Sequence, residues 1–247
     1  MLEMEIKMID VHSHIVYGVD DGAATLEESL RMMGEASRAG IQVIVATPHF
    51  HKGVYESDRI VDIYQRLEIK AADYNLKLLP GYEVFLNPLD PDFVGKDSRL
   101  TINGTKYLLG EFPFNAVPSY VLEAIYKLQV NGITPIIAHP ERNKCFIKDL
   151  GLLQDMVYRG CLVQIDAASL LGVYGVHAKR FSKKLIKSRM AHFVASDAHY
   201  PEDYADWYPK AHEKVRRWAG EEYAETVFNR NADMIFQSSK EYVPEVV

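Results

Sequence analysis

The 247-residue chain is poor in cysteine, which excludes two kinds of protein. Its two cysteines, Cys145 and Cys161, are too few for a disulfide framework, so we expect a reducing, cytoplasmic location. A cysteine-dependent phosphatase needs a reactive thiolate with an arginine shortly after it to hold the phosphate. Gly151 and Ala167 occupy the positions where that arginine would fall. Both cysteines are therefore interpreted as ordinary buried thiols.

Long apolar runs and an excess of positive charge are also missing. No stretch approaches the roughly 18 uninterrupted apolar residues of a membrane span, and residues 1–7 lack the apolar core of a signal peptide. The formal net charge is −6, whereas binding to a nucleic-acid backbone needs a basic surface. We therefore expect no membrane insertion and no nucleic-acid partner. A phosphorylated substrate stays compatible, because bound cations can reverse the local charge.

The chain has no internal repeat, low-complexity tract or Gly/Ser linker, and instead alternates short apolar runs with amphipathic stretches. This alternation is typical of an α/β protein. The predicted strands are residues 7–11, 41–46, 77–82, 106–110, 134–138, 162–165 and 192–195. The predicted helices are residues 25–40, 57–75, 119–131, 148–159, 177–188 and a region from about 208. Residues 87–103 and a polar tail after Phe236 are predicted to be irregular.

Seven strands joined by crossover helices predict one domain over residues 1–247. A closed or nearly closed parallel barrel buries seven consecutive βα units most naturally. An open, doubly wound sheet is the structural alternative. The segment 25–28, Thr-Leu-Glu-Glu, matches a capping box that would begin the first helix.

A potential metal ligand follows each of the seven predicted strands. In chain order these residues are His12 and His14, His49, Glu83, Glu111, His139, Asp166, and Asp197 with His199. The active sites of parallel barrels lie at the carboxyl ends of the strands, so these side chains should converge on one mouth.

The individual motifs differ in what else could explain them. His12 and His14 lie on one face of a strand because strand side chains alternate, but two solvated loop histidines would read the same way. For His49 and His139, the alternatives are a structural turn histidine and a satisfied histidine at the rim. Carboxylates that end apolar strands, as Glu83 and Glu111 do, are costly to desolvate without a cation, which a salt bridge could also supply.

Asp20 and Asp21 precede Gly22, and a simple turn with a helix cap is the alternative to metal binding there. As a set, several histidines and carboxylates without a thiolate suit Zn, Mn or Fe. The set is larger than one ion requires, so it predicts a multinuclear site.

Six segments together resemble the polymerase and histidinol phosphatase (PHP) superfamily. They are most similar to its branch of bacterial manganese-dependent protein-tyrosine phosphatases from capsule and exopolysaccharide loci. The segments are residues 8–14 (MIDVHSH), 19–22 (VDDG), 46–49 (ATPH), 81–83 (GYE), 137–142 (IAHPER) and 195–199 (ASDAH). The resemblance implies a distorted (β/α)7 TIM-like barrel with three divalent metal ions, most naturally Mn, with Fe or Zn as alternatives.

The resemblance also implies how the ligands divide among the three metals. His12, His14, Glu83 and Asp197 would hold one ion. Glu83 would bridge to a second ion, which Glu111 and His139 would also hold, and the third would be held by Asp21, His49 and His199. Arg142 matches an arginine that binds the substrate phosphate, and His199 or a metal-bound water would assist the leaving group.

The segment after His199 departs from this pattern, because a second phosphate-binding arginine is usual there. Residues 200–206 contain no arginine, and Lys210 or Arg216 would have to substitute for it. Exposed aromatic residues near the expected mouth could stack on a tyrosine ring or pack the rim. They are Tyr17, Tyr55, Phe85, Phe114 and Tyr200.

The predicted activity is hydrolysis of phosphotyrosine on a protein, and the resemblance suggests an autophosphorylating tyrosine kinase of polysaccharide export as partner. Three alternatives stay open from the sequence. One is a phosphatase for a small metabolite such as histidinol phosphate. The second is an amidohydrolase-type enzyme, although Glu83 and Glu111 stand where a bridging lysine is common in that class. The third is a metal-binding scaffold with weakened activity.

Overall fold

The computed structural model describes residues 8–51, 54–55, 59–86 and 97–237. Nine parallel strands form its centre, in two sheets of order β1-β2-β4 and β3-β5-β6-β7-β8-β9. The strands are β1 (Met8–Ser13), β2 (Ile41–Ala46), β3 (His49–Phe50), β4 (Lys77–Pro80), β5 (Glu83–Phe85), β6 (Tyr107–Glu111), β7 (Thr134–Ile137), β8 (Leu162–Asp166) and β9 (Phe193–Ala195).

The nine strands occupy seven positions around a curled sheet. The chain leaves β2 and enters β3 after two residues, and β4 passes into β5 in the same way, so the second and third positions are each split between the sheets. The circuit continues from β9 to β1, because Ser13 forms a parallel bridge with Ala198 and the His14 amide donates to the Ala198 carbonyl at 2.9 Å. This confirms the expected distorted (β/α)7 barrel and excludes the open, doubly wound alternative.

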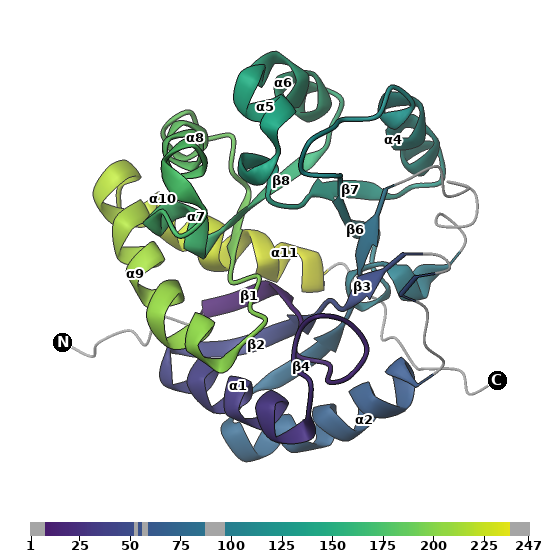
Figure 1. The fold of residues 1–247 in the computed structure, drawn as a ribbon, viewed down its shortest axis with the longest axis vertical. Coiled ribbons are helices and arrows are strands. Elements are labelled where there is room, and N and C mark those ends of the chain that lie inside the picture. Colours follow the sequence, from purple (N-terminus) through teal and green to yellow (C-terminus); the bar gives the residue numbers. More distant parts are fainter. Residues whose placement is uncertain (1–7, 52–53, 56–58, 87–96, 238–247) are drawn as a thin grey trace.

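Helices cover the outside of this barrel (Figure 1). α1 and α2 lie along the three-stranded sheet, and α4 to α6 flank the other sheet. The α-helices are α1 (Leu26–Arg38), α2 (Ile60–Ala71), α4 (Val121–Val130), α5 (Lys144–Lys148), α6 (Leu150–Tyr158), α7 (Ala167–Leu171), α8 (Gly175–Lys187), α9 (Pro201–Ala219), α10 (Glu221–Glu225) and α11 (Asn231–Gln237). Short 3-10 turns are η1 (Ala72–Tyr74), η2 (Ser98–Leu100), η3 (Ile102–Gly104) and η4 (Pro140–Arg142), and η5 (Thr226–Arg230) is a π-helix.

Two apolar clusters make up the core. The larger one packs the helices against the outer faces of the strands. The smaller one fills the barrel with inward side chains such as Ile9, Val45, Leu109 and Ile136, and it includes Ile235 of α11. The C-terminal helix therefore closes one end of the barrel interior, and the strand ends that carry polar residues are left at the other.

Most predicted elements appear with shifted ends. Thr25 caps α1 as expected, because its hydroxyl accepts from the Glu28 amide at 3.3 Å. The last helical region begins at Pro201 rather than near residue 208, because Asp203 accepts the His199 and Tyr200 amides and proline favours the first turn. Of the predicted loop 87–103, residues 87–96 lie outside the described residues, as does the predicted tail from residue 238. Among the described helices, none is long and apolar enough to cross a membrane.

Candidate metal centre

The barrel mouth gathers all nine predicted ligands into four overlapping groups. In each group the nitrogen and oxygen atoms that could bind a cation lie within 4.8 Å of one another. The groups are His12–His14–Asp197, His12–Glu83–His139, His49–Glu83–Glu111 and His14–Asp21–His49–His199. His12, His49, Glu83 and Glu111 lie on β1, β3, β5 and β6. His14 and Asp21 lie in the segment after β1, and the remaining three follow β7 and β9.

Glu83 lies where four histidine side chains meet. Its Oε2 atom is 3.3 Å from His12 Nε2, 3.4 Å from His14 Nε2 and 3.0 Å from His49 Nδ1, and Oε1 is 2.7 Å from His139 Nε2. Donor atoms that share one cation at bond lengths of about 2.1 Å are separated by about 3 Å. The carboxylate therefore lies between two groups of possible ligands, a position compatible with the bridging role that the resemblance implies.

His12 and His14 are oriented as ligands by partners on their other ring nitrogens. Nδ1 of His14 lies 2.9 Å from Asp20 Oδ2, and Nδ1 of His12 lies 3.2 Å from Gln164 Oε1. When each Nδ1–H donates to its partner, both Nε2 atoms carry lone pairs, and these atoms are 3.1 Å apart. Two facing lone pairs repel unless a cation or proton lies beside them, so the residues fit a bound metal ion.

Asp20 and Gln164 orient candidate ligands by hydrogen bonding to their rings. Besides His14, Asp20 accepts from the amides of Gly22 and His49, each at 3.0 Å, so the turn proposed for it and a role in positioning coexist. Gln164 is not among the residues expected at the site from the sequence. A polar side chain inside the apolar strand β8 is the feature that could have identified it. Its amide group also donates to Asp166 Oδ1 at 3.0 Å.

The outer part of the site contains Asp21 and Glu111. Asp21 Oδ1 lies 3.3 Å from His49 Nε2 and 3.5 Å from His199 Nε2, which is the grouping expected for these three residues. Glu111 Oε1 lies 3.2 Å from His49 Nδ1, and the two share a group with Glu83. The resemblance instead implies that Glu111 and His139 bind the same ion, and these two residues share no group among the described residues.

The buried charges of the site require positive partners. Burial opposes charging of His49 and His139, but nearby carboxylates outweigh it and raise their pKa values to about 12 and about 10. Burial also opposes charging of the Glu83 and Asp197 carboxyls. The adjacent histidines, His12 foremost, outweigh it and lower both pKa values. Without metal, protons on the histidines therefore balance the carboxylates.

Two of the candidate ligands have strained backbones. His139 has φ 33° and Asp197 has φ 52°, a left-handed region that non-glycine residues rarely adopt. Such strain costs on the order of 1–3 kcal/mol and is concentrated at functional sites.

Arg142 lies beside the ligand groups, at the end of η4. Its Nη1 atom donates to Asp197 Oδ2 at 2.6 Å and to Asp166 Oδ2 at 3.2 Å. Asp166, one of the polar residues that follow predicted strands, thus contacts this arginine and belongs to none of the four ligand groups found among the described residues.

Two of the five predicted aromatic residues, Tyr55 and Phe114, contact side chains of the site. The Tyr55 ring stacks on His49 at 5.3 Å between centroids, and Phe85 stacks on His51 at 4.6 Å. Arg142 Cζ lies 4.6 Å from the Phe114 ring and 4.1 Å from the ring of Tyr174, a residue that the sequence analysis missed. Tyr17 packs against the outer core, while Tyr200 is exposed.

The two basic residues considered as substitutes for a second arginine have other partners. Lys210 pairs with Asp206 at 3.2 Å, and Arg216 pairs with Glu213 at 2.6 Å, both on the exposed side of α9. These contacts give no support to a role for either residue at the mouth.

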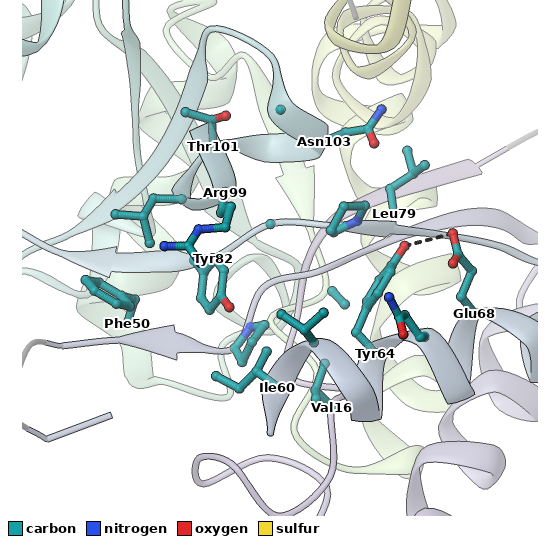
Figure 2. Close-up of a pocket in the computed structure, with 18 of the residues that line it drawn as sticks. Val16, Phe50, Ile60, Tyr64, Glu68, Leu79, Tyr82, Arg99, Thr101 and Asn103 are labelled. Atoms are coloured by element: carbon teal, nitrogen blue, oxygen red, sulfur yellow. Dashed lines mark hydrogen bonds between the residues drawn. The ribbon is translucent and has the colours of Figure 1, made fainter. Parts of the chain in front are cut away.

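A cavity of about 770 Å³ lies behind the site, between α2 and the η2–η3 turns (Figure 2). Phe50 and Tyr82 line it, whereas His49 and Glu83, their neighbours in the chain, belong to the ligand groups. Side chains alternate along a strand, so the cavity and the ligand groups lie on opposite faces of the same strands.

A parallel α/β barrel with a cluster of histidines and carboxylates at its mouth defines the structural class. Within it, the chain belongs to the CpsB/CapC family, described as capsular polysaccharide synthesis, whose model matches residues 8–237. This membership confirms the resemblance to the capsule-locus branch.

Individual relatives agree with the family assignment. The tyrosine-protein phosphatase YwqE of Bacillus subtilis is 41% identical over 197 residues, covering 78% of this chain and 77% of its own. The tyrosine-protein phosphatase CpsB of Streptococcus agalactiae is 31% identical and covers 94% and 99%. Crystal structures of YwqE from Bacillus subtilis and CpsB from Streptococcus pneumoniae are described as unique metal-dependent tyrosine phosphatases. The matching chain among them aligns at a TM-score of 0.86 with 35% identity, and the alignment covers 95% of this chain and 96% of that one.

Proposed function

We propose that this protein is a metal-dependent protein-tyrosine phosphatase that hydrolyses phosphotyrosine, with an autophosphorylating tyrosine kinase of capsular or exopolysaccharide synthesis as its partner. The observation that carries the proposal is the position of Glu83, whose two oxygens lie within 3.4 Å of nitrogens from four histidines. The names of its family relatives support the reaction. The cytoplasmic location stays a prediction.

The proposed cofactor is a set of three divalent cations, most naturally Mn²⁺, held by the nine residues of the four ligand groups. Bound there, the cations would supply a nucleophilic water of lowered pKa and would stabilise negative charge on the phosphate. The four carboxylates of the groups leave such a cluster net positive, which favours a phosphate dianion despite the acidic chain.

Arg142 is the residue proposed to hold the phosphate. Its side-chain hydrogen bonds within the described part of the chain come from Nη1, which leaves the edge formed by Nε and Nη2 for the substrate. Arg99 is an example of two-point hydrogen bonding by this edge. Its Nε and Nη2 donate to the two carboxylate oxygens of Asp97 at 2.8 and 2.7 Å. A phosphate offers the same two-oxygen geometry, which lysine cannot match.

His199 is proposed as a ligand through Nε2 or, when Nε2 carries a proton instead of a cation, as an aid to the leaving group. Its Nδ1 lies 2.9 Å from the Asp197 carbonyl, which orients the ring with Nε2 toward Asp21. Tyrosinate has a reference pKa of about 10 and leaves more readily than an alkoxide, so weak acid assistance is sufficient.

The test compares substrates with and without metal. Protein freed of metal by a chelator should not hydrolyse p-nitrophenyl phosphate, and added Mn²⁺ should restore turnover. The restored protein should cleave a phosphotyrosine peptide in preference to a phosphoserine peptide and histidinol phosphate. Faster cleavage of histidinol phosphate would transfer the assignment to a metabolite phosphatase, and no turnover of any substrate would leave a scaffold.

A further inference from the structure

Two aromatic rings flank the guanidinium of Arg142. Phe114 lies in the segment after β6 and Tyr174 lies at the start of α8, so distant parts of the chain meet at this arginine. The Arg142 side chain is 20% exposed, while Phe114 and Tyr174 are 43% and 38% exposed. Exposed rings that contact a half-buried cation contribute little to the core, so a role in the site is the better explanation.

We propose that Phe114 and Tyr174 are positioning residues that hold Arg142 with its Nε–Nη2 edge turned toward the substrate phosphate. This inference rests on the proposed phosphatase function and adds two residues to it. The carboxylates of Asp166 and Asp197 both accept hydrogen bonds from one atom, Nη1. Hydrogen bonds at a single atom leave the guanidinium plane free to rotate about that atom. Contact with two ring faces restricts that rotation, so less side-chain entropy is lost when phosphate binds.

Stacking on the tyrosine ring of the substrate is the competing role for the two residues. Arg142 Cζ already lies over each ring, at 4.6 Å from the centroid of Phe114 and 4.1 Å from that of Tyr174. The faces that meet the guanidinium are therefore unavailable to a substrate ring. The two roles differ in what they recognise: the first acts on any phosphate and the second on aryl phosphates alone.

The experiment uses metal-loaded full-length protein and the variants Tyr174→Leu and Phe114→Leu. For each we expect the inhibition constant of inorganic phosphate to rise about tenfold, together with the KM values for p-nitrophenyl phosphate and for glycerol phosphate. The effect on kcat should be smaller. Tyr174→Phe keeps the ring and should restore most of the phosphate affinity. Tyr158→Leu, an exposed tyrosine on α6, is the matched control and should behave as the wild type.

Losses confined to the aryl substrate, with unchanged inhibition by phosphate, would overturn the proposal in favour of substrate stacking. A double-mutant cycle adds a second criterion, since Tyr174→Leu should cost little further once Arg142→Lys has removed the positioned group. A full additional loss in that background would also contradict it. If the wild type cleaves no phosphotyrosine, the proposed function fails separately, and calorimetric titration with inorganic phosphate still tests the two rings.

Discussion

Glu83 shows most directly how single side chains define the site. The side chain is 1% exposed, and burying a carboxylate costs several kcal/mol unless cations surround it. Four histidines from β1, β3 and the end of β7 do surround it, yet each can be neutral and is itself poorly solvated. Metal ions satisfy both requirements, because they neutralise the carboxylate and accept the nitrogen lone pairs.

Replacing His139 or Asp197 by alanine tests the ligand assignment. Turnover should fall at least about 100-fold, because loss of groups that only support a ligand already costs 10–100-fold. The fold should persist, because each substitution leaves the two apolar core clusters unchanged. Turnover rates and thermal melts measure both effects. His177→Ala, an exposed histidine on α8, should change neither quantity, and full activity in His139→Ala or Asp197→Ala would remove that residue from the site.

Polar residues placed after apolar runs predicted most of the side chains that meet at the barrel mouth, but not the residues that support them. His12, Glu83 and Asp197 could be identified because polar residues directly after apolar runs converge in a parallel barrel. Tyr174 could not, because it lies in a turn before α8, far in sequence from the arginine that it contacts. Residue types alone also did not show that Glu111 would face His49, which depends on how β3 and β6 are placed.

At the scale of elements, buried hydrogen bonds join the first strand, β1, to the residue after β9 and to helix α9. The Asp10 carboxylate of β1 accepts from the Ser196 amide at 2.8 Å, the Ser196 hydroxyl at 2.5 Å and the Tyr204 hydroxyl of α9 at 2.9 Å. These bonds stabilise the charged carboxylate against the burial that raises its pKa. His12 lies two residues after Asp10, and Asp197 lies one residue after Ser196. The hydrogen bonds between Asp10 and Ser196 therefore fix the separation of His12 and Asp197.

The C-terminal helix gives the clearest test at this scale. Ile235 of α11 is 1% exposed and packs into the barrel interior, so Ile235→Ala should lower the free energy of unfolding by about 2–5 kcal/mol. Urea denaturation measures the change. Met234→Ala, at a neighbouring residue that is 58% exposed, should stay within about 0.5 kcal/mol. Equal effects of the two substitutions would show that α11 does not seal the barrel.

Sequence patterns located most elements and missed the breaks between them. The short apolar runs and the Thr25 cap of α1 follow local rules, so they were predictable. The two-residue strand β3 has no periodicity to detect. At Gly81, between β4 and β5, a Cβ would lie 3.0 Å from Val45 Cγ1, a tertiary contact that no local sequence pattern reveals.

For the whole molecule, metal binding and proton binding compete at one site. His49 and His139, with pKa values near 12 and 10, are protonated at pH 7 in the metal-free protein and must lose their protons to bind a cation. Metal affinity should therefore increase as the pH rises, since fewer protons need to be displaced.

Titration of metal-free protein with Mn²⁺ in weak buffer at pH 7 measures this competition. We expect proton release as the cation displaces protons from the ligand histidines, and weaker binding at pH 5.5. Binding with no proton release, or with an affinity that does not change with pH, would contradict the proposed exchange.

Anomalous X-ray scattering at the manganese edge, from crystals of the protein grown with Mn²⁺, tests the central claim most directly. Three peaks should appear among the nine side chains at the barrel mouth, with Glu83 within bonding distance of at least two. The absence of any peak beside Glu83, His139 and Asp197 would show that the convergence of these residues does not create a metal centre.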